Sequence, residues 1–216
     1  MEKMLPKTTK SAVVSLIIIV LLATSGAAPG RPINTSPTKV TIDPGHGGYD
    51  PGAIVSGVTE KSINLQIALK VKKLGERHSA LDFVFTRVTD DYVPLLDRLE
   101  YAEKQGSEGY LSIQANSFRD PGVHGVETIL DKTRGQGGAS WGLAESIQAS
   151  IIDRTGARDR GIRHQRLYTR YTEIPSAMVE VGFLTSPFER NNLSSSDYQE
   201  EIARGIVEGL LEHFSR

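Results

Sequence analysis

The chain has 216 residues, with 25 Lys and Arg against 26 Asp and Glu and a formal net charge of −1. It contains no cysteine, which excludes disulfides, thiolate metal ligands and a lipid-bearing cysteine. The balanced charge and the lack of a basic block argue against nucleic acid as a partner.

The first residues have the pattern of a secretory signal. Three lysines precede an apolar run over residues 12–23, and small residues follow. We therefore predict a signal peptide over residues 1–27, with cleavage after Ala27. An uncleaved membrane anchor over 11–28 is the alternative, because that length is close to what spans a bilayer. In either case we expect export to the extracellular, periplasmic or cell-wall space, with membrane contact only through an uncleaved segment.

Residues 28–38 are polar and rich in proline, which predicts a tether before the folded part. The remainder, 39–216, is enough chain for one well-buried core and too short for two. Without residues 1–27, which hold three Lys and one Glu, the net charge becomes −3. We expect a mildly acidic single domain that acts as a monomer.

The folded part alternates short apolar strands with amphipathic helices. The expected strands cover residues 40–42, 82–86, 109–114, 125–130, 167–169 and 177–181. The expected helices cover 62–77, 95–105 and 141–155, with a closing helix through Ile202, Ile206 and Leu210. This alternation predicts an α/β fold: a single domain with a mostly parallel twisted sheet and helices on both faces.

Polar side chains gather where predicted strands end. His46 lies in the glycine-rich loop after the first strand, Gln114 and Asn116 end the third, and Glu180 stands in the last. Ligands of parallel sheets bind outside the carboxyl ends of the strands. Glu60 begins the first helix and lies within reach of the same edge. His46 and Glu60 together indicate one half of a metal site.

Glu180 interrupts an otherwise apolar run, Ala177–Val181. An ionised carboxylate in such a strand is costly unless it is paired or lies near a metal. The position therefore indicates a functional carboxylate, with a solvated face of an edge strand as the alternative. Glu60 has an alternative too, because acidic residues are favoured at helix starts by the helix dipole.

Six motifs, in this order, carry a resemblance to a known family. They are Asp43-Pro44-Gly45-His46-Gly47-Gly48, Asp50-Pro51-Gly52-Ala53, Glu60-Lys61, Thr86-Arg87, Ser112-Ile113-Gln114-Ala115-Asn116-Ser117 and Val179-Glu180-Val181-Gly182-Phe183-Leu184. Together they resemble the zinc-dependent N-acetylmuramoyl-L-alanine amidases of bacterial cell walls. Several motifs in the family's order are far more specific than one short pattern.

The resemblance implies a hydrolase of peptidoglycan catabolism and cell wall organisation. It implies a Zn2+ ion held by His46 and Glu60, with Glu180 as the catalytic carboxylate that takes a proton from the attacking water and passes it to the departing amine. The implied substrate bond is the amide between the lactyl group of N-acetylmuramic acid and the L-alanine of the stem peptide.

The sequence departs from the family at the third metal ligand, where Gln114 replaces a histidine. An amide oxygen suits harder cations than zinc, so this ligand set predicts weaker zinc binding. Two outcomes stay open: a weakly active amidase, or an inactive relative that binds the cell wall or regulates other enzymes. His124 is a candidate replacement ligand if its loop folds back.

Two further residues are candidates for binding the substrate. Asn116 is a hydrogen-bonding neighbour of the predicted site. Arg87 is expected to pair with a carboxylate near the sheet edge, with direct substrate contact as a second role.

One competing motif, Gly-x-Ser-x-Gly over 138–142, has no predicted strand before it, so Ser140 is better interpreted as a helix N-cap than as a serine nucleophile. The glycines of the His46 loop do not match a dinucleotide fingerprint or a phosphate-binding loop. A metallopeptidase that cuts another amide is the third functional hypothesis.

Overall fold

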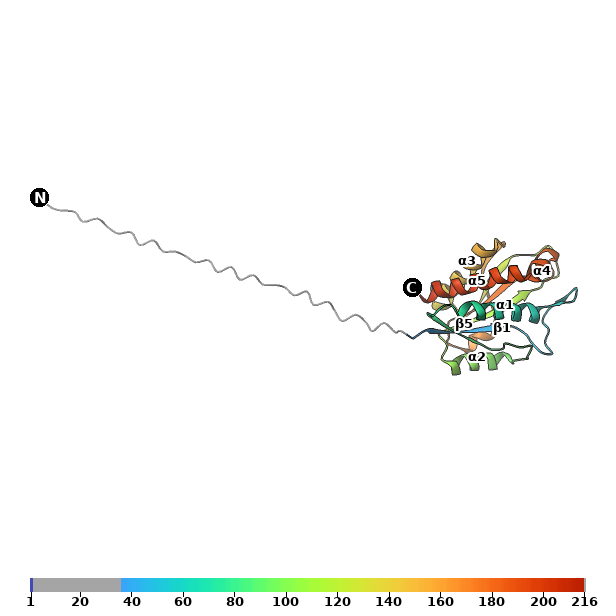
Figure 1. The fold of residues 1–216 in the computed structure, drawn as a ribbon, viewed down its shortest axis with the longest axis horizontal. Coiled ribbons are helices and arrows are strands. Elements are labelled where there is room, and N and C mark those ends of the chain that lie inside the picture. Colours follow the sequence, from blue (N-terminus) through green and yellow to red (C-terminus); the bar gives the residue numbers. More distant parts are fainter. Residues whose placement is uncertain (2–35, 216) are drawn as a thin grey trace. The chain divides into compact units, whose positions relative to one another are not determined.

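Six strands form the central sheet of the computed structural model, which describes Met1 and residues 36–215 (Figure 1). In the order β4-β1-β5-β8-β6-β7 they are Leu81–Phe85, Thr38–Pro44, Gly109–Asn116, Ser176–Phe183, Val126–Asp131 and Asp159–Gln165. The predicted signal peptide and most of the predicted tether lie outside the described residues. No helix in the described part is both long and apolar enough to cross a membrane.

The sheet is mixed in direction. Strands β4, β1, β5 and β8 run parallel, and β6 and β7 are parallel to each other, but β6 pairs with β8 in the antiparallel direction. The mostly parallel sheet predicted from the sequence is confirmed, whereas the reversal at β6 was not predicted. Because of it, the start of β6 lies beside the end of β8, and Glu127 is the register partner of Glu180.

Helices cover both faces of the sheet, as predicted. Figure 1 shows α1 (Glu60–Gly75), α3 (Ala139–Thr155) and α5 (Ser196–Phe214) on one side and α2 (Leu95–Gln105) on the other. The short elements are β2 (Ile54–Val55), β3 (Val58–Thr59), the 3-10 helix η1 (Tyr168–Tyr171) and α4 (Pro187–Leu193). The periodic apolar positions of the first helix are all buried, which is why α1 packs on the sheet: Ile63, Ile67, Val71 and Leu74.

Two local predictions were wrong. The strand expected at 167–169 falls at the start of η1, and the edge strand is β7 instead. The β7 sequence, Asp-Arg-Gly-Ile-Arg-His-Gln, has a single aliphatic residue and so carries no strand periodicity. The N-cap of α3 is Gly138, and Ser140 lies inside the helix, where its hydroxyl accepts a hydrogen bond from the Ser176 amide at 3.0 Å.

Candidate active site

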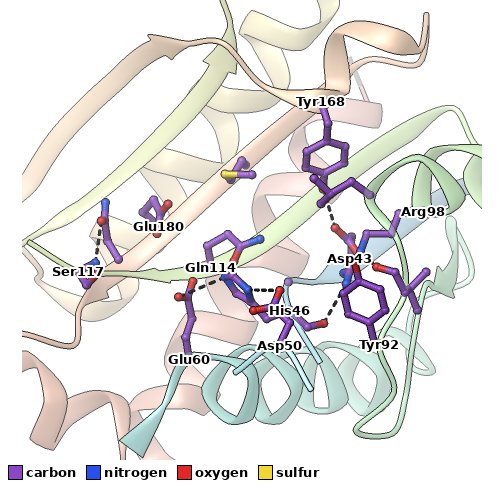
Figure 2. Close-up of a pocket in the computed structure, with 15 residues that line it drawn as sticks. Asp43, His46, Asp50, Glu60, Tyr92, Arg98, Gln114, Ser117, Tyr168 and Glu180 are labelled. Carbon is purple, nitrogen blue, oxygen red and sulfur yellow. Dashed lines mark hydrogen bonds and ion pairs between the residues drawn. The ribbon is translucent and has the colours of Figure 1, made fainter. Parts of the chain in front are cut away.

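A cavity of about 470 Å³ opens at the carboxyl ends of β1, β5 and β8. Five residues predicted for the site line it: His46, Glu60, Gln114, Asn116 and Glu180. Figure 2 shows Glu180 at one end of this cavity, His46 and Gln114 in the middle and Tyr92 and Tyr168 at the other end. The structure therefore gathers side chains that are up to 134 positions apart in the sequence.

The His46 loop has an unusual backbone conformation. The φ angle of His46 is 61°, in the left-handed region that residues other than glycine seldom occupy. Arg98 of α2 donates to the carbonyl oxygens of Pro44 at 3.0 Å and His46 at 2.9 Å. The same guanidinium forms an ion pair with the fully buried Asp43 at 2.7 Å. These contacts stabilise a conformation that the local sequence alone would disfavour.

Asp43 ties the loop to the rest of the fold. Its carboxylate accepts hydrogen bonds from the hydroxyls of Thr86 at 2.6 Å and Tyr168 at 2.8 Å. Burial raises the pKa of Asp43, but the charge of Arg98 and the hydrogen bonds outweigh it, so the net pKa is below the usual value. Asp43 is therefore a charged structural support at the wall of the cavity.

Arg87 lies beneath the same loop and does not line the cavity. It donates to the carbonyl oxygens of Pro44 at 2.9 Å, Gly45 at 2.8 Å and Lys61 at 3.0 Å, and it is 4% exposed. The expected carboxylate partner is not found among the described residues; backbone carbonyls take its place. This geometry suits support of the loop rather than contact with substrate.

His46 stands between two carboxylates. Its Nδ1 lies 2.8 Å from Oδ2 of Asp50, and its Nε2 lies 3.3 Å from Oε2 of Glu60. Partial burial lowers the pKa of His46, but Glu60 and Asp50 outweigh it and raise the pKa to about 9. Glu60 is itself fixed by the backbone amides of Ala53 at 3.0 Å and Ala115 at 3.2 Å. Sequence reasoning had given Asp50 no role, although it is four residues from His46.

This pair has the spacing of two ligands on one ion. Zinc ligands at 2.0–2.1 Å in tetrahedral geometry are about 3.3 Å apart, which matches the separation of His46 Nε2 and Glu60 Oε2, 3.3 Å. Asp50 contacts the other ring nitrogen, and metal-binding histidines are commonly oriented by a carboxylate in that position. The described residues hold no group of three His, Cys, Asp or Glu around one point. Gln114, the third ligand predicted from the sequence, lines the same cavity.

Gln114 occupies the third position with an amide that already has partners. Its Oε1 accepts a hydrogen bond from Asn64 at 3.3 Å, and its Nε2 donates to Ser112 at 3.0 Å. The amide lies against Gly45, where an added Cβ would come within 1.9 Å of it. An amide oxygen keeps a second lone pair, so Gln114 fits a cation as a weak third ligand. The proposed substitute, His124, does not line the cavity, and its ring lies 2.9 Å from the Gly122 carbonyl oxygen.

Glu180 is a buried carboxylate with little local compensation. It is 9% exposed, and its Oε2 has no hydrogen-bond partner within the described part of the chain. Burial, followed by the charges of Glu60 and Glu127, raises its pKa to about 8. A buried polar atom without a partner is uncommon in folded proteins and suits a group that acts on a ligand.

Glu127 is a neighbouring carboxylate that the sequence analysis missed. Its Oε2 pairs with Arg160 at 2.8 Å, and its Oε1 accepts a hydrogen bond from Asn116 at 3.1 Å. Glu127 thus has the partners that Glu180 lacks. Asn116 lines the cavity and connects it to this ion pair. The structure thus places Asn116 next to the other predicted site residues.

The raised pKa of Glu180 makes stability depend on pH. A glutamate in the unfolded chain has a pKa of about 4.3, whereas burial raises that of folded Glu180 to about 8. Between these values the folded state holds a proton that the unfolded state has lost, so the free energy of unfolding falls as pH rises. The measurement is urea unfolding in the presence of a chelator. Between pH 5 and pH 8, we expect the free energy of unfolding of wild type to fall by on the order of 2–4 kcal/mol relative to that of Glu180→Gln. Parallel pH profiles of the two proteins would contradict this.

The chain matches known proteins along most of its length. The family model described as N-acetylmuramoyl-L-alanine amidase matches residues 40–212. The N-acetylmuramoyl-L-alanine amidase LytC of Bacillus subtilis (strain 168) is 35% identical over 176 residues, which cover 81% of this chain and 35% of LytC. The sporulation-specific N-acetylmuramoyl-L-alanine amidase of the same strain is 32% identical, covering 82% of this chain and 68% of that protein.

A solved structure shows the same fold. The catalytic domain of CwlV, an N-acetylmuramoyl-L-alanine amidase from Bacillus (Paenibacillus) polymyxa var. colistinus, matches with a TM-score of 0.77 and 34% identity, over 82% of this chain and 98% of that domain. The chain spans about a third of the length of LytC and nearly all of the CwlV domain. The resemblance and the fold predicted from the sequence are thereby confirmed, and the chain belongs to the N-acetylmuramoyl-L-alanine amidase family.

Proposed function

We propose that this chain hydrolyses peptidoglycan at the amide between the lactyl group of N-acetylmuramic acid and the L-alanine of the stem peptide. One observation carries the proposal: the same cavity is lined by the His46–Glu60 pair and by Glu180, whose Oε2 has no hydrogen-bond partner among the described residues. Membership of the family supports the choice of substrate. We further propose that residues 39–216 are the catalytic domain and that residues 1–27 direct export to the cell wall, periplasm or outside.

The proposed cofactor is Zn2+, with His46 and Glu60 as ligands and Gln114 as a weak third. When bound, zinc supplies Lewis acidity at this point of the cavity. Asp50 holds the His46 ring with Nε2 directed at Glu60. In the metal-free protein at neutral pH, both ring nitrogens of His46 are protonated, because Glu60 and Asp50 raise its pKa to about 9. Metal binding therefore displaces that proton.

Glu180 is the proposed general base and acid. In the metal-free protein, burial raises the pKa of Glu180 to about 8, in the range where a carboxyl group both accepts and releases a proton near neutral pH. In the ionised form it accepts a proton from the attacking water. It then donates that proton to the nitrogen of the departing L-alanine, so that the lactyl group leaves with a carboxylate and the peptide with a free amine.

A second function is favoured by one observation, the bonded amide of Gln114. If Asn64 and Ser112 hold this side chain away from a cation, the chain is an inactive relative that binds the cell wall or regulates other enzymes. The two functions predict different metal contents and different products.

The test is digestion of purified peptidoglycan with the full chain, with and without added zinc, followed by mass spectrometry of the soluble fragments. We expect stem peptides that begin with a free L-alanine amine, and glycan strands with free lactyl carboxylates. Cleavage within the peptide would instead identify a metallopeptidase. Absence of both products at saturating zinc, with sedimentation on the peptidoglycan retained, would identify the binding module and overturn the enzymatic proposal.

A further inference from the structure

Two exposed tyrosines form a stacked pair at one end of the cavity. The rings of Tyr49 and Tyr92 are 4.2 Å apart at their centroids with an interplanar angle of 30°. Tyr49 is 80% exposed and Tyr92 is 38% exposed. Tyr92 lines the cavity (Figure 2), and Val93 and Leu95 belong to the same lining. We call Tyr49, Tyr92 and Leu95 the tyrosine ledge; exposed apolar side chains gathered beside a cavity indicate a binding surface.

The ledge is held in place by bonds between its two loops. The Gly48 amide donates to Asp90 at 3.0 Å, and Lys61 donates to both the Gly48 carbonyl oxygen and Asp90, each at 2.7 Å. Gly48 has a φ of +58°, and a Cβ there would come within 2.8 Å of the Tyr92 amide nitrogen. The glycine thus permits the close approach of the loops that carry the two tyrosines.

The charged side chains around the ledge differ from those that lie beyond Asn116. Asp50, Asp90 and Asp91 lie on the loops that carry the tyrosines, and the amine of Lys61 is engaged by Asp90. Outside the cavity, Glu127 accepts a hydrogen bond from Asn116 of the cavity lining, and two arginines share the Glu127 carboxylate. They are Arg160 at 2.8 Å and Arg163 at 3.9 Å.

We propose that the tyrosine ledge binds the glycan strand of peptidoglycan, while the stem peptide extends towards Arg160 and Arg163. The inference rests on the proposed function, because it assumes that the scissile amide lies at His46 and Glu180. An amide that joins a sugar to a peptide must place the two on different sides of the reacting atoms. The uncharged N-acetyl sugars suit the aromatic surface, because the apolar faces of pyranose rings stack on aromatic rings. The carboxylates of the stem peptide suit Arg163, whose side chain is 53% exposed and lies 3.9 Å from Glu127.

Binding of peptide-free glycan strands tests the ledge without any need for catalysis. Soluble strands of at least four uncharged N-acetylglucosamine units, which carry neither a stem peptide nor a lactyl carboxylate, are titrated into the full chain and binding is measured by calorimetry. We expect Tyr49→Ser and Tyr92→Ser each to weaken binding at least about fivefold. Tyr49→Phe and Tyr92→Phe should keep near wild-type affinity, because they retain the ring. Phe188→Ser is the matched control, since Phe188 is 70% exposed and does not line the cavity.

Equal affinity of the two serine variants and wild type would overturn the proposal, as would equal losses in the serine variants and Phe188→Ser. So would a wild type that fails to bind peptide-free strands. Failure of the proposed function has a different signature: strands bind the ledge, the serine variants lose that binding, and no amide is cleaved. If the enzyme is active, the serine variants should raise KM for polymeric peptidoglycan and leave KM for a single-sugar muramoyl peptide unchanged.

Discussion

Glu180→Gln is expected to lower the rate of amide hydrolysis at saturating zinc by about 10²–10⁴-fold, because this is what proton transfer by a positioned side chain contributes. Glutamine keeps the shape of the side chain but neither accepts a proton from water nor returns one to the amine. The Oε2 atom of Glu180 has no hydrogen-bond partner among the described residues. The substitution therefore breaks no ion pair there. The variant should fold and bind zinc as wild type does. The measurement is kcat for release of L-alanine-terminated peptides, together with zinc content.

The matched control is Glu127→Gln. Glu127 is the register partner of Glu180 on the adjacent strand, but its carboxylate is occupied by Arg160 and Asn116. We expect this variant to retain activity within about tenfold. Because the charge of Glu127 contributes to the raised pKa of Glu180, the acid limb of its pH profile should move to lower pH. If Glu127→Gln is the inactive variant and Glu180→Gln is active, the two roles are reversed.

The local parts of the fold could be predicted because they depend on short-range patterns. Apolar residues at helical spacing predicted α1, and a β-branched run predicted β1. Strand β7 could not be predicted, because buried and exposed side chains do not alternate along it; all of its residues are partly or fully exposed to solvent. The direction of β6 could not be predicted either, since the strand pattern is the same in both directions.

The site divides in the same way. The meeting of His46, Glu60 and Glu180 at one cavity could be predicted, because a histidine among glycines, an acidic helix start and a charge in an apolar strand are visible in the sequence. Arg98 carries no such signal; its partner Asp43 is 55 positions away and meets it only in the folded chain. The same holds for the tyrosine ledge, where Tyr49 and Tyr92 stack across 43 positions. These contacts depend on tertiary structure, which periodicity and short motifs do not encode.

Gln114→His is expected to tighten zinc binding at least about tenfold, because an imidazole nitrogen is a better zinc ligand than an amide oxygen. The side chain at position 114 lies directly against Gly45, which has no Cβ to clash with it, and Asn64 and Ser112 are hydrogen-bonding partners for an imidazole. The measurement is competition with a chromogenic chelator, with amidase activity at limiting zinc as a second readout. Activity should rise with occupancy if wild type is a weakly loaded enzyme.

Gln165→His is the matched control for that substitution. Gln165 ends β7 and is exposed, and it does not line the cavity, so a histidine there adds an imidazole without completing the ligand set. Its zinc affinity should equal that of wild type. Combining Gln114→His with His46→Ala should remove the gain, because the new imidazole would bind together with His46 and Glu60 and not alone. A gain that survives His46→Ala, or that Gln165→His reproduces, would show that His46, Glu60 and position 114 do not share one ion.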